Sequence, residues 1–193
     1  MNKIKLVFAT HNLNKLKEIK SLLPANFEVM SLEDINCHED IAETENTIEG
    51  NALLKANYIK ENYGYDCFAD DSGLEIDALN GEPGVYSARY AGEPKNDQAN
   101  IDKVLQKLAN ERNTRANFKT VIAYVTNKEQ QLFTGICEGN IIKNQKGENG
   151  FGYDPIFVPE GENKTFAEMT LEEKNQFSHR KKAFAKFLNH FKK

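Results

Sequence analysis

Three features that would direct attention to particular functions are scarce in this 193-residue sequence: cysteine, long apolar runs and net positive charge. Cys37, Cys67 and Cys137 stand far apart with no CxxC pair, so the sequence indicates neither a zinc site nor a disulfide framework. No apolar run reaches the length of a signal-peptide core or a membrane span, so we expect a cytoplasmic protein without membrane association. The net charge of −4 gives no overall attraction to nucleic acid, so an anionic substrate must be held by local cations or a metal.

The composition is that of a folded chain, with 39% apolar and 28% charged residues. No linker, repeat or low-complexity segment divides the sequence, so we expect a single domain over residues 1–193. Apolar patterning predicts strands over residues 4–9, 27–32, 67–69, 74–79, 116–126, 131–138 and 156–158, and helices over residues 14–23, 47–63, 97–108 and from 178 onward. Helices alternate with strands early and strands pair in the middle, which indicates an α/β fold with an elongated mixed sheet.

The first polar cluster lies between the first predicted strand and the first predicted helix, at Thr10-His11-Asn12-Leu13-Asn14-Lys15. A strand-to-helix turn presents free backbone N–H groups and the positive end of the helix dipole. Small polar side chains and Lys15 would complete a phosphate-binding loop there. The alternative is an ordinary helix cap with a solvated lysine, since short patterns of this kind are common.

The second cluster is rich in carboxylates. Glu43 lies in an acidic, irregular stretch, and Asp70-Asp71-Ser72-Gly73 follows a short buried strand. Mg²⁺ prefers oxygen ligands and often uses one or two carboxylates with phosphate oxygens and water. The carboxyl end of a strand is where open α/β sheets place their ligands. The alternative is a solvated turn in which an aspartate acts as a cap.

The third cluster, Phe151-Gly152-Tyr153-Asp154-Pro155, follows a glycine-rich stretch that we expect to be a flexible loop. An aromatic ring on such a loop can stack on a base, and the carboxylate after it can accept a hydrogen bond from the base edge. The alternative is a loop anchor whose ring packs into the core.

The fourth cluster combines Lys174 with Ser178-His179-Arg180. Ser178 is predicted to cap the last helix, whose exposed N–H donors would face an acceptor together with the side chains of His179 and Arg180. The alternative is a capped helix with a solvated basic first turn. Cations lie at the unfavourable end of the helix dipole there, and a nearby anion or carbonyl would relieve that cost.

The order and spacing of these clusters are more specific than any one of them. The motifs are Thr-x-Asn-x-x-Lys at 10–15, Glu43, Ala-Asp-Asp-Ser-Gly-Leu at 69–74, Pro-Gly-Val-Tyr-Ser-Ala-Arg-Tyr at 83–90, Phe-Gly-Tyr-Asp-Pro at 151–155 and Ser-His-Arg at 178–180. From residue 4 to about residue 188 the sequence closely resembles the inosine triphosphate pyrophosphatase family. His11 is a departure, because many members carry glycine at that position.

The resemblance implies a two-lobed α/β fold on a long, curved mixed sheet flanked by helices, with the nucleotide in a cleft between the lobes. It also implies a homodimer that hydrolyses non-standard purine nucleoside triphosphates (ITP, dITP and XTP) to the monophosphate and pyrophosphate. The cofactor would be Mg²⁺, as one or more ions per subunit. No nucleic acid or membrane partner is expected.

Residue roles follow from the same resemblance. Asp71 would be the catalytic carboxylate and general base, Glu43 and Asp71 would hold Mg²⁺, and Asp70 would assist. The positions expected around the substrate are Thr10, His11, Asn12, Leu13, Asn14, Lys15, Lys55, Ser72, Phe151, Gly152, Tyr153, Asp154, Lys174, Ser178, His179 and Arg180. Lys15 and Lys55 would contact the triphosphate and Phe151 would stack on the purine.

Two other functions remain open at the level of sequence. One is a phosphatase or pyrophosphatase for another substrate, such as modified pyrimidine triphosphates. The other is a nucleotide-sensing or RNA-binding module that uses a basic C-terminal stretch: Arg180, Lys181, Lys182, Lys186, Lys192 and Lys193. The net negative charge and the apolar helix face beneath those cations weigh against the second alternative.

Overall fold

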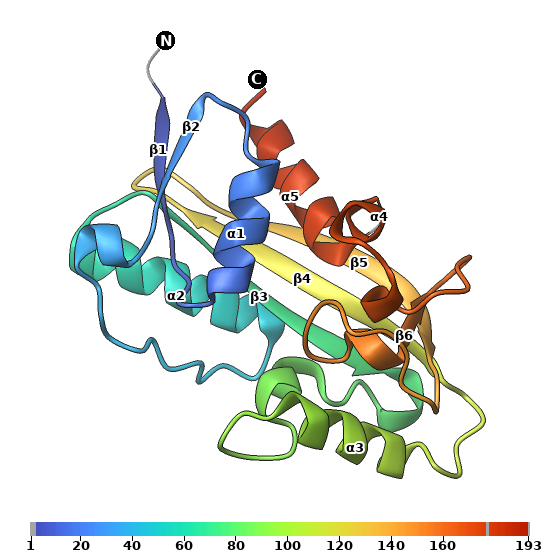
Figure 1. Cartoon of the computed structure of the whole chain (residues 1–193). Helices are drawn as coiled ribbons and strands as arrows, with labels where there is room; N and C mark the ends of the chain where they lie inside the picture. Colours follow the sequence, from blue (N-terminus) through green and yellow to red (C-terminus); the bar gives the residue numbers. More distant parts are fainter. Residues whose placement is uncertain (1–2, 177, 193) are drawn as a thin grey trace. The chain divides into compact units, whose positions relative to one another are not determined.

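A computed structural model describes residues 3–176 and 178–192, with the side chains of Asn14 and Glu18 outside the described part. The sheet has the strand order β2-β1-β3-β4-β5-β6. Its strands are β1 (Ile4–Phe8), β2 (Phe27–Met30), β3 (Cys67–Ile76), β4 (Arg115–Val125), β5 (Gln130–Ile141) and β6 (Phe157–Pro159). Strand β1 pairs in parallel with β2 and β3, whereas β5 and β6 are antiparallel. The predicted α/β fold on a mixed sheet flanked by helices is confirmed (Figure 1).

Four helices agree with the predicted positions within a few residues, and a short helix, α4, precedes the last of them. The helices are α1 (Leu13–Leu22), α2 (Ile48–Tyr63), α3 (Asp97–Lys107), α4 (Leu171–Asn175) and α5 (His179–His190). Short 3₁₀ turns occupy η1 (Glu33–Ile35), η2 (Asp77–Leu79), η3 (Gly84–Arg89), η4 (Asp154–Ile156) and η5 (Phe166–Glu168). No helix in the described part of the chain combines the length and apolar character needed to cross a bilayer.

The chain forms two compact units that share strands β3, β4 and β5. Unit 1 comprises residues 1–71, 121–134 and 184–193, and unit 2 comprises residues 72–120 and 135–183. Each shared strand begins in one unit and ends in the other. The prediction of a single domain stays a prediction.

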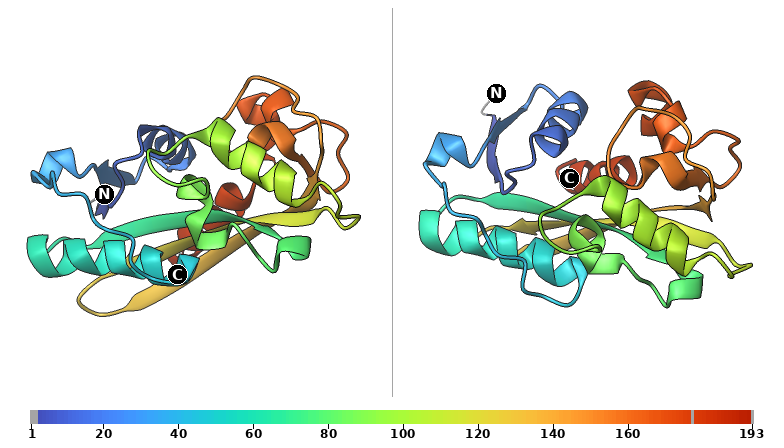
Figure 2. Two further views of the ribbon diagram at one scale, coloured as in Figure 1. Left: turned by 90° about the horizontal axis from the view of Figure 1, so that it is seen from below. Right: turned by 60° about the horizontal axis from the view of Figure 1, so that its bottom comes forward.

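Unit 1 is built around aromatic rings on strands and on the end of α5. Phe8 of β1 stacks on Phe68 of β3 at a centroid distance of 4.6 Å, and Phe187 of α5 lies 5.0 Å from Phe68. All three are fully buried. Helices α1 and α2 cover opposite faces of the strands of this unit (Figure 2). Such packing stabilises the unit through apolar burial and leaves the polar ends of the strands for a site.

Unit 2 has its own core, in which α3 packs through Ile101 and Val104. Phe118 of β4 contacts Phe157 and Phe166 at centroid distances of 4.7 and 5.8 Å. Helix α4 begins with a capping box, in which the Thr170 hydroxyl accepts from the Glu173 N–H while the Glu173 carboxylate accepts from the Thr170 N–H.

Strand β3 differs from its prediction. Residues 70–73 were expected to follow a short strand at its carboxyl end and to precede a second strand, but β3 is continuous from Cys67 to Ile76, and η2 begins at Asp77. The two aspartates therefore lie in mid-strand and not at its carboxyl end. Their side chains are only 1% and 7% exposed for Asp70 and Asp71, which excludes the solvated turn. Buried carboxylates require partners, and those partners come from distant parts of the sequence.

Candidate functional site

The predicted site residues fall into two groups, one in each unit, and we describe each group by itself. In unit 1 the predicted residues are Thr10, His11, Asn12, Leu13, Asn14, Lys15, Glu43, Lys55, Asp70 and Asp71. In unit 2 they are Ser72, Phe151, Gly152, Tyr153, Asp154, Lys174, Ser178, His179 and Arg180.

The loop before α1 is shaped by its own small polar side chains. The Asn12 N–H donates to the Thr10 hydroxyl at 3.1 Å, and the Asn12 side-chain oxygen accepts from the Lys15 N–H at 3.1 Å. Asn12 is therefore a cap of α1, which agrees with one part of the alternative prediction, an ordinary helix cap with a solvated lysine. The other part is wrong, because the Lys15 ammonium is not solvated but pairs with the buried Asp70 at 3.0 Å.

The remaining residues of this loop differ in exposure. Leu13 is 77% exposed at the start of α1. His11 Nε2 lies 2.9 Å from the Glu39 carbonyl oxygen, in the irregular segment that also carries Glu43. Asn14 lies in the first turn of α1, and its side chain falls outside the described residues.

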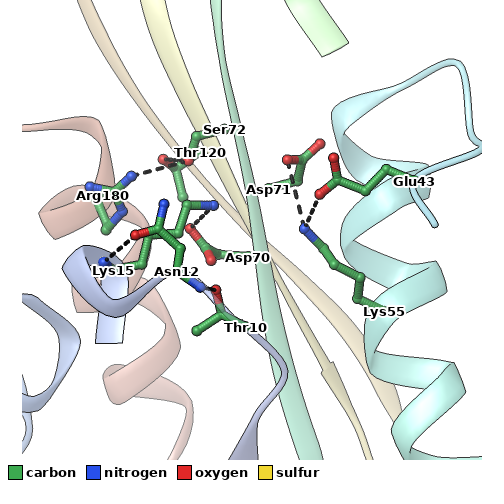
Figure 3. Close-up of polar contacts among 10 residues, drawn as sticks. All are labelled: Thr10, Asn12, Lys15, Glu43, Lys55, Asp70, Asp71, Ser72, Thr120 and Arg180. Carbon is green, nitrogen blue, oxygen red and sulfur yellow. Dashed lines mark hydrogen bonds and ion pairs between the residues drawn. The ribbon is translucent and has the colours of Figure 1, made fainter. Parts of the chain in front are cut away.

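A carboxylate–lysine group, defined as Glu43, Lys55, Asp71, Lys15 and Asp70, forms the polar part of unit 1 (Figure 3). The Lys55 ammonium donates to Glu43 Oε1 at 2.7 Å and lies 3.8 Å from Asp71 Oδ1. Helix α2 supplies Lys55 and strand β3 supplies both aspartates. The structure thus brings together five of the predicted residues, drawn from four segments of the sequence.

Burial and pairing act in opposite directions on the pKa of Asp71. Burial raises this pKa to about 6, although the ammonium groups of Lys55 and Lys15 lower it. Burial alone would lower the pKa of Lys55, but the charges of Asp71 and Glu43 outweigh it, so that pKa is raised. The lysine stays charged, and the aspartate is poised to exchange a proton near neutral pH.

The carboxylates of this group fit the kind of Mg²⁺ site in which substrate phosphate oxygens complete the coordination of the ion. Asp71 Oδ2 is buried and has no hydrogen-bond partner among the described residues. The Glu43 carboxylate pairs with Lys55, which also lies near Asp71. No group of three or more Asp, Glu, His or Cys side chains in the described part of the chain could hold a metal alone. Mg²⁺ commonly takes one or two carboxylates plus substrate phosphate oxygens, so Glu43 and Asp71 suffice. Asp70 is engaged by Lys15.

An aromatic–cation group, defined as Phe151, Asp154, Lys174 and Arg180, forms the polar part of unit 2. The Lys174 ammonium donates to Asp154 Oδ2 at 2.7 Å and lies 5.3 Å from the centre of the Phe151 ring. The Arg180 guanidinium carbon lies 5.9 Å from the same ring. Phe151 remains 37% exposed, so its ring is not the buried loop anchor of the alternative prediction. An exposed ring beside cations and a carboxylate can receive a flat, polar ligand.

The start of α5 carries three further predicted residues. The Ser178 hydroxyl accepts from the Lys181 N–H at 3.2 Å, which confirms Ser178 as the helix cap. His179 stacks on Phe118 at 4.9 Å, and Arg180 is only 2% exposed, so the solvated basic turn is wrong. An Arg180 side-chain nitrogen (Nη2) approaches the Ser72 hydroxyl at 3.5 Å (Figure 3).

Several residues that contact the predicted site residues were not predicted from the sequence. Thr120 bonds the Ser72 hydroxyl at 2.7 Å, the Glu39 carbonyl contacts His11, and Asp97 accepts from the Gly152 N–H at 2.7 Å. Each contact joins positions at least 28 residues apart. An acidic residue in a helix's first turn was the one local signal for Asp97, and it points equally to a helix-dipole role.

Within the basic C-terminal stretch, Lys181, Lys182, Lys186 and Lys192 are exposed in the described residues. Arg180 is buried, Lys182 donates to the Ile136 carbonyl at 2.8 Å, and Lys186 donates to the Thr134 carbonyl at 2.6 Å. Lys193 lies outside the described residues.

The mixed sheet flanked by helices defines an α/β protein that carries one charged polar group in each of its two units. The chain belongs to the Ham1 family, which matches residues 6–190. It is 59% identical over 189 residues to the dITP/XTP pyrophosphatase of Flavobacterium psychrophilum, covering 98% of this chain and 100% of that relative. It is 51% identical over 182 residues to the protein of the same name from Porphyromonas gingivalis, covering 94% of each.

Solved structures agree with this assignment. The Ham1 protein of Staphylococcus aureus is 42% identical with a TM-score of 0.90, covering 98% of this chain and 100% of that one. The Ham1 protein of Coxiella burnetii is 38% identical with a TM-score of 0.91, covering 97% and 98%. These findings confirm both the family and the fold predicted from the motifs.

Proposed function

We propose that this chain is a nucleoside-triphosphate pyrophosphatase that hydrolyses dITP, XTP and ITP to the monophosphate and pyrophosphate. The observation that carries the proposal is the buried Asp71 carboxylate, whose pKa is raised to about 6, beside Glu43 and Lys55. A carboxylate with a pKa near neutral is suited to accept a proton from water. The names of the relatives, dITP/XTP pyrophosphatases, point to the substrate class.

In the proposed reaction, water attacks the α-phosphorus and pyrophosphate leaves. Asp71 orients the water and takes its proton, while Lys15 and Lys55 neutralise charge that develops on the leaving pyrophosphate. Mg²⁺ held by Glu43 and Asp71 would supply Lewis-acid polarisation of the phosphate. Thr10, Asn12 and Ser72 line the path of the triphosphate. The proposal includes no covalent intermediate, because water itself is the nucleophile.

The aromatic–cation group gives the base preference in this proposal. Phe151 stacks on the purine, and donors from Lys174, His179 and Arg180 face the 6-keto oxygen of hypoxanthine or xanthine. Adenine presents an amino donor at the same position, which would leave donors facing one another. Unpaired polar groups of this kind are worth several kcal/mol of discrimination, about 10²-fold or more.

The decisive experiment is a panel of triphosphates incubated with the protein and Mg²⁺, with pyrophosphate resolved from orthophosphate. We expect ITP, dITP and XTP to give monophosphate and pyrophosphate in equal amounts, and ATP to react far more slowly. Early accumulation of IDP and orthophosphate would contradict attack at the α-phosphorus. A preference for modified pyrimidine triphosphates would instead support the alternative substrate class.

The homodimer that the family resemblance implies is part of the same proposal. Light scattering coupled to size-exclusion chromatography of the full chain should give twice the monomer mass of 21.9 kDa. A mass equal to the monomer at micromolar concentration would remove the dimer from the proposal.

A further inference from the structure

The loop that carries Phe151 has no helix or strand of its own. Residues 143–153 form no helix or strand, and hydrogen bonds such as those from the Asn149 N–H to the Ala167 carbonyl and from the Asp154 N–H to the Phe151 carbonyl hold the loop. A loop that must order itself when a ligand binds weakens affinity, whereas a loop held in its bound conformation does not. The contacts that hold this loop therefore bear directly on base binding.

Part of the loop's conformation is fixed from within. The Phe151 N–H donates to Asp154 Oδ2 at 3.0 Å. Gly150 has a φ of +81°, and a Cβ atom there would lie 2.0 Å from Asp154 Oδ2. The chain thus turns tightly over the Asp154 carboxylate, and only glycine fits at the turn.

Next to Phe151, two further hydrogen bonds hold the loop to other segments of unit 2. The Tyr153 hydroxyl donates to the Ser87 carbonyl at 2.8 Å, inside the 83–90 motif, which had no assigned role. The Gly152 N–H, next to Phe151, donates to Asp97 Oδ2 at 2.7 Å. Tyr153 is buried in the core, so its loss would disturb folding, whereas the Asp97 contact lies on the surface.

Helix α3 does not need Asp97 as its cap. Asn96 already caps the helix by accepting from the Ala99 N–H at 2.9 Å, which leaves the Asp97 carboxylate free to reach across to the loop. Ile101 and Val104 anchor the same helix in the core of unit 2. Asp97 therefore joins the loop to a rigid element, and the hydrogen bond to its ionised carboxylate is of the stronger kind.

We propose that Asp97 is a positioning residue that holds the 150–154 loop so that Phe151 and Asp154 present a preformed surface to the base. The inference rests on the proposed function, in which Phe151 stacks on the purine. Asp97 touches no reacting atom, so its loss weakens nucleotide binding and leaves the chemical step intact. The effect therefore falls on KM and not on kcat.

The test compares Asp97→Ala, Asp97→Asn and Asp102→Ala in the full chain, with ITP and Mg²⁺. Asp102 is the matched control, because it lies on the same helix and bonds only Gln98 in the described hydrogen bonds. We expect Asp97→Ala to raise KM by about threefold to tenfold with kcat changed less than about twofold, because this hydrogen bond is exposed and contributes less than a buried one to a charged group. Asp97→Asn, whose amide oxygen still accepts, should restore most of the affinity, and Asp102→Ala should match the wild type.

A second readout does not depend on turnover. The chain has no tryptophan, so Phe151→Trp introduces a single fluorescent reporter in the loop. Titration of this variant with IMP, with and without Asp97→Ala, reports binding directly. We expect weaker binding by the same factor in the double variant.

Three outcomes overturn the inference: an unchanged KM in Asp97→Ala, a loss of kcat equal to the loss of affinity, or an Asp97→Asn variant that behaves as the alanine. The last result would assign Asp97 to the helix dipole. Failure of the proposed function is distinguishable, because the wild type would then not release pyrophosphate from ITP, or Phe151→Ala would leave KM unchanged.

Discussion

The two polar groups of this protein solve different physical problems. The carboxylate–lysine group of unit 1 buries charges of both signs in contact with one another. Lys55, for example, forms ion pairs with Glu43 and Asp71. The aromatic–cation group of unit 2 places cations around an exposed ring, with Asp154 as its acceptor. Buried charge pairs shift pKa values and suit chemistry, whereas a ring with fixed donors suits recognition.

This contrast makes a direct prediction about substitutions. Changes in the carboxylate–lysine group should alter turnover or the pH dependence of stability, with equal effects on all nucleotides. Changes in the aromatic–cation group should alter the ranking of nucleotides. The predictions below test that division, beginning with the largest expected effect.

Asp71→Asn should remove most turnover while the protein stays folded, because a neutral amide cannot take the proton of the attacking water. Loss of one general base costs about 10²–10⁴ in rate, and more if the metal is also lost. Steady-state kinetics with ITP measure the change, and circular dichroism checks the fold. A variant with kcat near that of the wild type would show that Asp71 is not the base.

The same substitution should stabilise the protein in the absence of metal and nucleotide. The folded-state pKa of Asp71 is raised from 3.8 to about 6, so its contribution to stability is full below pH 4 and is lost as the pH rises through about 6. At pH 7 the ionised carboxylate therefore lowers the free energy of unfolding by up to about 3 kcal/mol. The Asp71→Asn variant avoids this cost, and Lys55 still pairs with Glu43.

Urea unfolding in EDTA measures this difference between pH 4 and pH 8. We expect the free energies of unfolding of wild type and Asp71→Asn to converge near pH 4 and to diverge as the pH rises through 6, with the variant more stable. A variant that is less stable at pH 7 would mean that the pairing with Lys55 outweighs burial.

Arg180→Ala tests the recognition side of the comparison. A hydrogen bond from a charged donor is worth about 1.5–3 kcal/mol, so kcat/KM for ITP should fall roughly tenfold to a hundredfold. The preference for ITP over ATP should shrink, because the substitution also removes a donor that repels the adenine amino group. Equal losses for ITP and ATP, with an unchanged ratio, would place Arg180 on the phosphates instead.

The contrast also explains which parts of the structure could be predicted from the sequence. Local sequence patterns predict structure where the contacts are local. The Ser178 cap could be predicted because its hydrogen bond joins residues only three positions apart. Strand β3 was misplaced because Asp-Asp-Ser-Gly has the composition of a turn, and the contacts that keep it extended and buried come from Lys15 and Lys55. The segment spacing of the motifs identified the family.

Contacts on the surface could not be predicted from the sequence for a different reason. The hydrogen bond between Asp97 and the Gly152 N–H joins positions 55 residues apart, and it uses a backbone group that no sequence pattern marks. The same holds for His11 and the Glu39 carbonyl. Sequence reasoning therefore found the residues of both groups but not the contacts that orient them.

His11 provides the smallest test of the division, because it belongs to unit 1 but not to the carboxylate–lysine group. Its Nε2 lies 2.9 Å from the carbonyl of Glu39, four residues before Glu43, so it links the loop before α1 to the segment that carries a proposed metal ligand. His11→Ala removes one exposed hydrogen bond, worth about 0.5–1.5 kcal/mol at most. We expect the Mg²⁺ concentration for half-maximal rate to rise about twofold to fivefold, equally for ITP and dITP, with the ITP/ATP ratio preserved. His38→Ala is the matched control, since this exposed histidine lies beside Glu39 in the same segment, and it should match the wild type. If His11→Ala instead changed the ITP/ATP ratio, base selection would extend into unit 1, and the division between chemistry and recognition would not hold.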